Sequence, residues 1–309
     1  MKLATIIVTF NRLEKLKKTL SLYDNIVYDS DYVIVVNNHS TDGTSAFLKE
    51  WNKNGNSDKK IVLDLDDNLG GAGGFYYGCK KALELPVDWL LLADDDAYPD
   101  DNLFINFNLY AKGHDLNSIS AICSSVYKVD GTIDIGHRKQ LTYVCGLRPS
   151  IISITEDEYK NEIFKLDLFS YVGVFLKVSV LKKVGLCNPD LFIYYDDMEH
   201  SMRINSTGKI ICVPTIKYIH DDGLRQAKAN NNVLMSWRDY YDIRNKIYIL
   251  IQHKLFAGVF WALSRFCMCF YEYPNNFKCQ KLYLSAIWDG VVGHLGKHKL
   301  YKPGFSIMK

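Results

Sequence analysis

Residues 88–96 read DWLLLADDD, an apolar run that ends in three consecutive acidic residues. A short apolar run bounded by polar residues is typical of a strand buried on both faces, as in parallel sheets covered by helices. We therefore predict a core strand over residues 88–93, with Asp94, Asp95 and Asp96 just beyond its carboxyl end.

Three strand-like runs precede this one, with a helical pattern after each. Strands are predicted over residues 3–10, 32–36 and 61–65, and helices over 12–23, after the cap-like residues 40–42, and from the glycines at 70–74. This alternation predicts βαβ units and an α/β fold with a mostly parallel, Rossmann-like sheet flanked by helices. Farther on, strands are expected over 120–128 and 170–178, and helices over 178–184 and 195–206.

Composition limits the class of protein. The chain has 309 residues, of which 48% are hydrophobic and 23% charged, so it is neither disordered nor collagen-like. Eight cysteines form no CxxC pair, which favours reduced thiols. The N-terminus lacks a signal-peptide pattern, and the apolar stretch 255–271 is interrupted by Arg265. We therefore expect a cytoplasmic protein.

The net charge of +2 conceals an asymmetry. Residues 1–222 hold 24 Lys/Arg and 31 Asp/Glu, whereas residues 223–309 hold 13 and 4, a balance of +9. We predict an α/β domain over 1–222 and a basic, aromatic-rich helical region over 223–309. Cations mixed with aromatic residues favour peripheral contact with an anionic membrane, such as the inner face of the plasma membrane. Packing on the α/β domain or on a second subunit is the alternative.

Polar clusters follow the predicted strands. Residues 9–12 (TFNR) follow the first strand, residues 37–44 (NNHSTDGT) the second, and the glycine-rich residues 68–74 (NLGGAGG) the third. The carboxyl ends of parallel strands line one crevice, where ligands bind. Each of the first two clusters alone is compatible with ordinary turn and cap chemistry.

The acidic triplet points to a cation. Consecutive carboxylates at the end of a buried strand repel one another and resist loss of water. Asp94 and Asp96, two apart on an extended backbone, point the same way and can share one Mg²⁺ or Mn²⁺ ion. The alternative is a solvated acidic turn. His220, directly after an apolar run, is a candidate third ligand, although a lone histidine is more often structural.

A second acidic cluster lies in residues 192–200 (FIYYDDMEH). Acidic residues at a helix N-terminus are stabilised there in any protein. Together with two tyrosines they also fit a substrate pocket, in which a carboxylate takes a proton from an attacking hydroxyl.

In order and spacing, these motifs resemble family 2 glycosyltransferases, which have the GT-A fold. The resemblance covers most of residues 1–222 and is carried by TIIVTFNR, VVNNHSTDGT, LLADDDAYPD and YYDDMEH. With NLGGAGGF and the later histidine, the chain looks most like the galactofuranosyltransferase branch, with rhamnosyltransferases as close neighbours.

The resemblance implies a role for each matching residue. Asp94, Asp96 and His220 match ligands of Mn²⁺ or Mg²⁺ on the donor diphosphate, Asp197 matches the general base of an inverting transfer, and Asp196 orients hydroxyls beside it. The donor and acceptor are expected to contact Thr9, Asn11, Arg12, Asn37, Asn68, Gly70, Gly71, Asp95, Tyr195 and Glu199. Two positions depart from the family: Asn37 replaces an Asp that binds uracil, and His200 replaces an aromatic residue.

The resemblance therefore predicts a metal-dependent inverting transferase. Its expected substrates are a UDP-sugar donor, best UDP-galactofuranose, and a lipid-linked or cell-surface glycan acceptor. A homo-oligomer is possible, and no nucleic-acid partner is expected. A nucleotidyltransferase is an alternative, although residues 9–12 lack the glycine-rich loop that it usually needs. A non-catalytic binding module would need neither acidic cluster.

Overall fold

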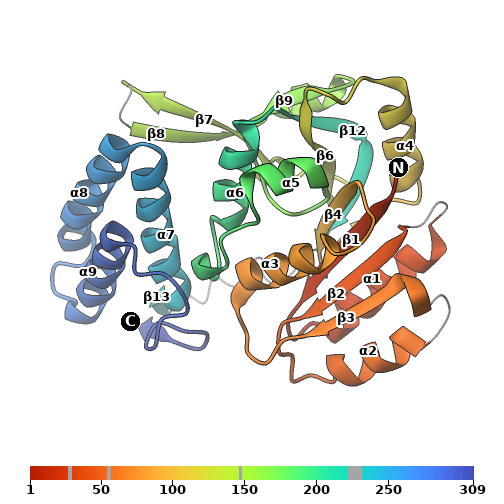
Figure 1. The fold of residues 1–309 in the computed structure, drawn as a ribbon. Helices are drawn as coiled ribbons and strands as arrows, with labels where there is room; N and C mark the ends of the chain where they lie inside the picture. Colours follow the sequence, from red (N-terminus) through yellow and green to blue (C-terminus); the bar gives the residue numbers. More distant parts are fainter. Residues whose placement is uncertain (27–29, 54–56, 146–147, 222–231) are drawn as a thin grey trace.

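A computed structural model of the chain describes residues 1–26, 30–53, 57–145, 148–221 and 232–309. The predicted boundary between residues 222 and 223 lies outside these described residues. Within them, a central sheet flanked by helices occupies one side of the molecule, and a helical unit formed by the C-terminal residues occupies the other (Figure 1).

The central sheet has nine strands among the described residues, in the order β3-β2-β1-β4-β11-β6-β12-β5, with β9 also paired to β12. Strands β1, β2, β3 and β4 run parallel, as do β6 and β12, whereas β11, β5 and β9 are antiparallel to their neighbours. The bounds are β1 Leu3–Thr9, β2 Tyr32–Asn37, β3 Lys60–Asp64, β4 Trp89–Asp94, β5 Ala97–Pro99, β6 Ile119–Lys128, β9 Phe164–Leu166, β11 Val174–Lys177 and β12 Lys209–His220.

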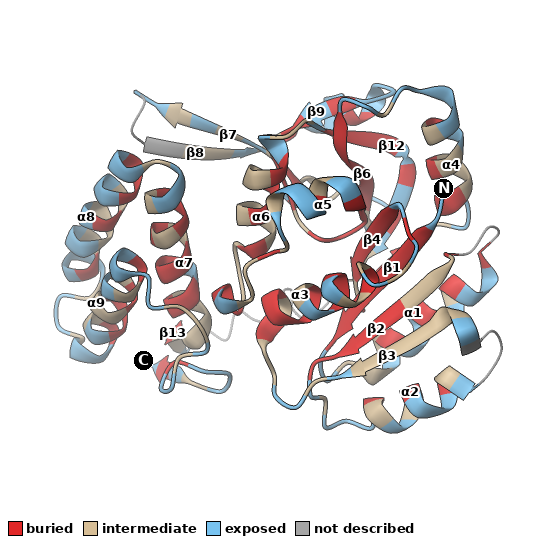
Figure 2. Ribbon diagram, in the orientation of Figure 1, coloured by how far each residue is buried: buried red, intermediate tan, exposed pale blue. Residues whose placement is uncertain are grey.

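Helices cover both faces of this sheet, because side chains alternate along its strands. On one face, Ile6 and Val8 of β1 lie in a core shared with α3, α5 and α6; on the other, Leu3 and Ile7 lie in a core shared with α1, α2 and α4. Figure 2 shows the central strands almost wholly buried between these layers. The bounds are α1 Leu13–Asn25, α2 Thr44–Lys53, α3 Gly70–Ala82, α4 Leu103–Gly113, α5 Val178–Val184 and α6 Asp196–Asn205, with short 3₁₀ turns η1 Ser57–Lys59, η2 Ile135–His137, η3 Glu156–Lys160 and η4 Pro189–Leu191.

One predicted strand is wrong in extent. The run over 170–178 contributes only β11 (Val174–Lys177) to the central sheet, because the backbone turns at Gly173, where φ is +67°. A side chain at Gly173 would meet the Ser124 hydroxyl at 2.2 Å, so only glycine fits there. The preceding strand β10 (Leu168–Phe169) joins a separate sheet with β7 (Arg138–Val144) and β8 (Arg148–Ser153).

The C-terminal region is helical, as predicted. It contains α7 (Trp237–His253), α8 (Leu255–Glu272) and α9 (Phe277–Val292), with a small sheet of β13 (Val233–Ser236) and β14 (Ser306–Met308). A capping box between Ser236 and Asp239 starts α7. The apolar core of this helical unit also includes Phe192 from the loop before α6, so the unit is packed directly on the part of the chain that forms the central sheet.

Candidate active site

The carboxyl ends of β1, β2 and β4 meet at one edge of the sheet, as the sequence predicts. Thr9 is paired with Asn37 in the parallel register, and Val8 is paired with Asp94. The polar clusters that follow these strands are therefore neighbours in space, although they lie tens of residues apart in the chain.

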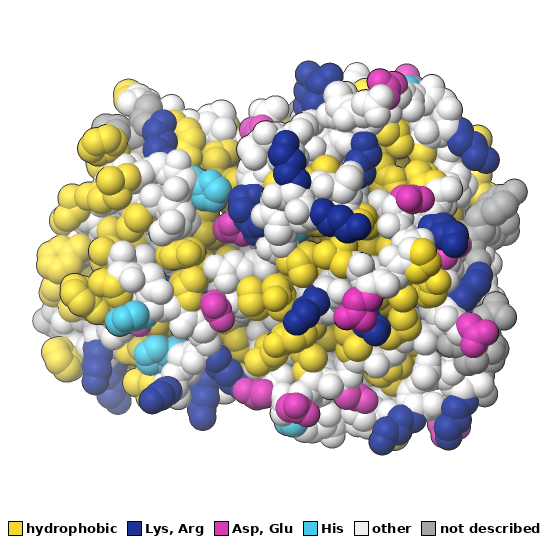
Figure 3. All heavy atoms as spheres, in the orientation of Figure 1, with side chains coloured by type: hydrophobic (Ala, Val, Ile, Leu, Met, Phe, Trp, Pro, Cys, Tyr) yellow, Lys and Arg dark blue, Asp and Glu magenta, His cyan; other side chains and the backbone are white. Residues whose placement is uncertain are grey.

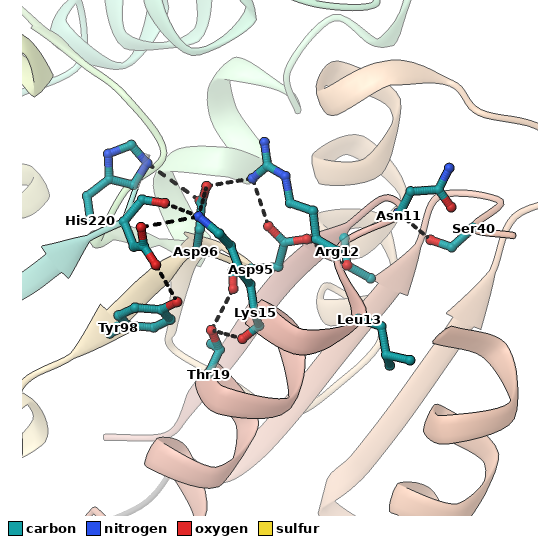
Figure 4. A network of polar contacts seen from close by, with 12 residues as sticks. Asn11, Arg12, Leu13, Lys15, Thr19, Ser40, Asp95, Asp96, Tyr98 and His220 are labelled. Carbon is teal, nitrogen blue, oxygen red and sulfur yellow. Dashed lines mark hydrogen bonds and ion pairs between the residues drawn. The ribbon is translucent and has the colours of Figure 1, made fainter. Parts of the chain in front are cut away.

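Asp96 lies among three basic side chains, those of Arg12, Lys15 and His220. Its Oδ1 is 3.5 Å from His220 Nε2, and its Oδ2 accepts a hydrogen bond from Arg12 Nη1 at 2.6 Å (Figure 4). The Arg12 bond fixes the carboxylate and leaves Oδ1 directed toward His220. Because of these cationic neighbours, the pKa of Asp96 lies below its usual value despite burial, which alone would raise it.

His220 reaches Asp96 because of strand pairing. The triplet is followed at once by β5, and β5 pairs antiparallel with the end of β12, which sets Ala97 opposite His220. Ligand atoms of Asp94, Asp96 and His220 then lie within 4.8 Å of one another. Two carboxylates and an imidazole at this spacing suit a divalent cation such as Mn²⁺ or Mg²⁺.

Asp94 shows why a cation fits. Removal from water, with the charge of Asp96 beside it, raises the pKa of Asp94 to about 7. The folded protein therefore disfavours the charged form of this carboxylate unless a positive charge compensates it. The structure thus gives a physical reason to place a metal at the strand end.

Asp95 shares Arg12 with Asp96, and both of its carboxylate oxygens have partners within the protein. Its two carboxylate oxygens accept hydrogen bonds from the Thr9 hydroxyl at 2.7 Å and from Arg12 Nη1 at 3.0 Å. Burial raises the pKa of Asp95 to about 6. Burial also lowers the pKa of Arg12, but the nearby aspartates outweigh it and raise that pKa overall. Thr9 therefore positions Asp95, and Asp95 in turn positions Arg12. The expected contacts of Thr9 and Asp95 with substrate stay predictions.

The loops after β1 and β2 are linked. The backbone nitrogen of Thr41 donates to Asn11 Oδ1 at 2.7 Å, and Asn11 itself is left-handed with φ of +52°. At the next strand edge, Asn37 Nδ2 donates to Asp64 Oδ1 at 2.6 Å and to Ser45 Oγ at 2.7 Å. Asn37 is therefore paired with a carboxylate, that of Asp64, on the neighbouring strand β3.

The start of α3 is held by a pair of asparagines. Asn38 Nδ2 donates to the carbonyl oxygen of Gly70 at 2.9 Å, and Asn68 Oδ1 accepts from the backbone nitrogen of Gly70 at 2.8 Å. A side chain at Gly70 would lie 1.8 Å from the carbonyl oxygen of Phe192, whereas one at Gly71 would meet nothing within 4 Å. Gly70 is thus required by packing, and Gly71 borders open space.

The second acidic cluster belongs to the same electrostatic site. Asp196 and Asp197 begin α6, and burial raises the pKa of Asp197 to about 6. The pKa of Asp196 lies well above its usual value because of burial, the adjacent Asp197 and the charge of Asp94. Two adjacent carboxyl groups with raised pKa values are typical of acid–base sites.

The turn that presents these two residues is strained. Phe192, Tyr194 and Tyr195 all have φ of +67°, a conformation that costs about 1–3 kcal/mol for each such residue. Two buried residues of α7 hold the turn. Asn245 Nδ2 donates to the carbonyl oxygens of Leu191, Ile193 and Tyr194 at 2.9–3.0 Å, and Arg244 Nη2 donates to that of Leu191 at 3.1 Å. The Tyr195 hydroxyl donates to Asp242 of α7 at 2.8 Å.

Two candidate residues of α6 have clear internal partners. Both carboxylate oxygens of Glu199 accept from Arg203, at 2.6 and 2.7 Å. His200 is fully buried, and its two ring nitrogens lie 2.8 Å from the Tyr171 hydroxyl and 3.1 Å from the carbonyl oxygen of Gly185. His200 therefore anchors α6, and the expected substrate contact of Glu199 stays a prediction.

Sequence reasoning missed one neighbour of the candidate metal site. The ring of His137 lies at 90° to that of His220, with centroids 4.9 Å apart, and His137 Nε2 is 3.3 Å from Asp134. Ligand atoms of Asp134, His137 and His220 also lie within 4.8 Å of one another. His137 precedes a hairpin far from any recognisable motif, so only the folded chain reveals its place.

Comparison with known proteins agrees with this geometry. A sequence model of Glycosyl transferase family 2 matches residues 5–185, more than half of the chain. The dTDP-rhamnosyl transferase RfbF of Shigella flexneri is 24% identical over 306 residues, which cover 94% of this chain and 96% of RfbF. The galactofuranosyltransferase GlfT1 of Mycobacterium tuberculosis is 27% identical over 316 residues, which cover 97% of each protein.

A solved structure shares the fold. The crystal structure of GalNAc-T7 with UDP, GalNAc and Mn²⁺ matches with a TM-score of 0.59 at 14% identity, over 80% of this chain and 51% of the other. This chain thus spans about half the length of that protein. The predicted GT-A fold with a C-terminal helical region is confirmed. The chain belongs to glycosyl transferase family 2 and is a glycosyltransferase.

Proposed function

We propose that this protein is a metal-dependent inverting glycosyltransferase that moves galactofuranose from UDP-galactofuranose to a hydroxyl of a lipid-linked or cell-surface glycan. The observation that carries the proposal is the group of metal-ligating side chains at the sheet edge. Ligand atoms of Asp94, Asp96 and His220 lie within 4.8 Å of one another, at or just after the end of β4 and at the end of β12.

Asp94, Asp96 and His220 are assigned as the metal ligands, with Mn²⁺ or Mg²⁺ as the ion. Carboxylate oxygens suit both ions, and GalNAc-T7 was crystallised with Mn²⁺. When bound, the cation supplies Lewis-acid stabilisation of the charge that develops on the leaving diphosphate. Arg12 holds Asp96 in place through Oδ2, which would leave Oδ1, on the side of His220, to hold the ion.

Asp197 is assigned as the general base. It accepts the proton of the acceptor hydroxyl while that oxygen forms a bond to the anomeric carbon of the sugar. The bond from that carbon to the diphosphate oxygen breaks, and the nucleoside diphosphate leaves from the opposite face, which inverts the configuration. Asp196, whose pKa is raised by burial and by the adjacent Asp197, positions hydroxyl groups beside the base.

The nucleotide is assigned to the sheet edge. Asn11, Arg12, Asn37 and Asn68 border it from successive loops, and Gly71 leaves open space for the sugar diphosphate. Thr9 holds Asp95 and Asp95 holds Arg12 through hydrogen bonds, and the backbone nitrogen of Gly70 donates to Asn68. Tyr195 and Glu199 are assigned to the acceptor side, next to Asp197.

The identity of the donor sugar is the most specific part of the proposal. GlfT1 is a galactofuranosyltransferase and RfbF a dTDP-rhamnosyl transferase, so transfer from dTDP-rhamnose is the second candidate. The GT2 match leaves the nucleotidyltransferase alternative without support.

A donor panel tests the proposal. Purified protein is incubated with UDP- and dTDP-sugars and with lipid-linked or synthetic acceptors, and the products are read by mass spectrometry. We expect transfer from UDP-galactofuranose that EDTA stops and Mn²⁺ or Mg²⁺ restores, with Asp197→Asn as the inactive control. Preference for a rhamnose or pyranose donor would refute the donor assignment. Transfer that is unaffected by EDTA would refute the metal assignment.

A further inference from the structure

Helix α8 turns most of its large apolar side chains to the solvent. Its exposed apolar residues include Leu255, Phe256, Val259, Phe260, Leu263, Phe266 and Phe270, with Phe256 73% exposed and Leu263 62%. Their spacing of three and four places them on one face of the helix. Figure 2 shows α8 largely exposed, and Figure 3 shows hydrophobic side chains gathered over α8 and α9. Exposed apolar patches of this kind mark interaction sites.

The inner face of α8 is made of small residues. Ala257, Gly258, Ala262 and Cys269 are its buried positions. A side chain at Gly258 would lie 2.4 Å from Ile251 of α7, so the two helices approach closely. In a helix adapted to water alone, the larger apolar residues would face the core. Here the arrangement is reversed, so the outer face is the one suited to an apolar environment.

Basic residues lie next to this face along the chain. Lys254 precedes α8, and Lys278 and Lys281 are exposed on α9, which shares a core with α8. Two nearby acids accept hydrogen bonds within the protein: Glu272, exposed at the end of α8, from the Tyr283 hydroxyl at 2.9 Å, and Asp289 from that of Tyr240 at 2.5 Å. A second copy of the chain would bring the same positive charges together. An anionic surface complements them.

We propose that α8 lies in the plane of an anionic phospholipid bilayer, with its large apolar side chains among the acyl chains and the lysines at the headgroups. Among the described residues, α8 is the one helix long and apolar enough to cross a membrane by length and composition. Its 18 residues extend about 27 Å, less than the roughly 30 Å of the hydrocarbon core. In-plane docking also preserves its contacts with α7 and α9, which spanning would break.

Docking fixes the active site relative to the surface. Helix α7 packs on α8 and, through Arg244 and Asn245, holds the turn before Asp196 and Asp197. Lys254 also lies over the Tyr143 ring of β7, at 4.1 Å from its centroid. The acidic cluster and the membrane-facing helix are thus parts of one packed unit. This inference stands apart from the donor assignment.

The test is co-sedimentation of the full chain with vesicles of phosphatidylcholine containing increasing phosphatidylglycerol. We expect binding that rises with phosphatidylglycerol and falls with salt. Phe256→Ser/Leu263→Ser should weaken vesicle affinity at least about tenfold, because two large apolar side chains no longer enter the bilayer. Lys278→Glu/Lys281→Glu should weaken binding mainly at low salt.

Matched controls come from the sheet domain. Leu109→Ser removes an exposed leucine of α4 that is 64% exposed, and Lys182→Glu/Lys183→Glu reverses two exposed charges of α5. Both controls should bind vesicles like the wild type. Each variant is also checked by its thermal melting temperature and by hydrolysis of a soluble UDP-sugar, which separates a docking defect from a fold or donor-site defect.

A label provides the second measurement. Cys267 and Cys145 are the exposed cysteines among the described residues. In a Cys145→Ser background, a polarity-sensitive fluorophore on Cys267 should shift to the blue with anionic vesicles. The same label on Ser21→Cys, in a Cys145→Ser/Cys267→Ser background, should not shift. Absence of vesicle binding at low salt overturns the proposal. Dimerisation that Phe256→Ser/Leu263→Ser abolishes, without vesicle binding, assigns the face to a second copy instead.

Discussion

The side-chain nitrogen of Asn245 lies 3.0 Å from the carbonyl oxygen of Tyr194, two residues before the first of the paired aspartates. It also reaches the carbonyl oxygens of Leu191 and Ile193 at 2.9 Å. A helix of the C-terminal region therefore holds the left-handed turn that presents Asp196 and Asp197. The two halves of the chain form one site, because the strained turn depends on donors from the second half.

Asn245→Ala tests this relationship. The two N–H groups of Asn245 are shared among three carbonyl oxygens. Leu191 keeps Arg244 as a donor, whereas Ile193 and Tyr194 lose the bond from Asn245, and an unsatisfied buried polar group costs about 1–3 kcal/mol. We expect kcat for transfer to fall at least about tenfold, with the donor KM nearly unchanged because the nucleotide loops lie elsewhere. Asn275→Ala, at an exposed position of the same region, is the control. A donor KM that rises in step with the loss of kcat would contradict a role confined to the turn.

Asp94→Asn separates metal binding from folding. The pKa of Asp94 is raised to about 7 in the folded protein, whereas an aspartate in the unfolded chain has a pKa of about 4. At a pH above the unfolded value, the charge on Asp94 therefore lowers the stability of the metal-free protein. At pH 8 we therefore expect the metal-free variant to melt at a higher temperature than the wild type. It should nevertheless lose the stabilisation that Mn²⁺ gives the wild type, together with transfer. Asp96→Ala should also abolish transfer. A Mn²⁺-induced shift that survives in both variants would remove them from the ligand set.

Asp197 should govern the acid limb of the pH profile. A base must be ionised, and burial raises the pKa of Asp197 to about 6, so kcat/KM should rise with pH through that region. Asp197→Asn should lower kcat by about 10²-fold or more and leave donor affinity intact. The raised pKa also predicts that Asp197→Asn is more stable than the wild type above pH 6. If Asp196→Asn is inactive while Asp197→Asn turns over normally, the base is the preceding residue.

Exchanging the side chains of Asn37 and Asp64 tests whether the two residues act as a pair. Asn37→Asp alone sets two carboxylates opposite each other on β2 and β3, where Asn37 now donates at 2.6 Å. We expect weaker UDP binding, by about tenfold, and a lower melting temperature. Adding Asp64→Asn restores one donor and one carboxylate, and coupled neighbours typically recover about 0.5–3 kcal/mol. Calorimetric titration with UDP measures the cycle, and a double variant no better than Asn37→Asp would show that the pair does not act as a unit.

Gly70 and Gly71 form a matched pair. Gly70→Ala should destabilise the fold severely, since its side chain would lie 1.8 Å from the Phe192 carbonyl oxygen. Gly71→Ala meets nothing within 4 Å and should leave the melting temperature unchanged or raise it, since alanine favours helix. Any loss of donor affinity in Gly71→Ala then reports on the space near the nucleotide. Equal melting temperatures for the two variants would contradict the packing role of Gly70.

The strand ends were the predictable part of this molecule. Apolar runs ending in TFNR, NNHS and ADDD are local signals, and parallel pairing is enough to bring them together. His220 was predicted from the resemblance, and β5 pairing explains its position. The partners of these residues were not predictable. Asp64 and His137 carry no motif. Their roles, and the bonds of Asn245 to the turn before Asp196, follow from register or from contacts between distant segments, which a single sequence does not record.

The hydrogen bonds of α7 also have a consequence for the order of synthesis. Arg244 Nη1 donates to the carbonyl oxygen of Gly296, and the Tyr241 hydroxyl accepts from the backbone nitrogen of His298. The helix that steadies the two aspartates is therefore itself held by residues that are synthesised 52 and 57 positions after its own donor and acceptor groups. A nascent chain can form the sheet edge with the acidic triplet first, and the turn before Asp196 receives this support only after residues 296–298 have been synthesised. By then the apolar helix α8, which precedes these residues in the chain, has already been synthesised.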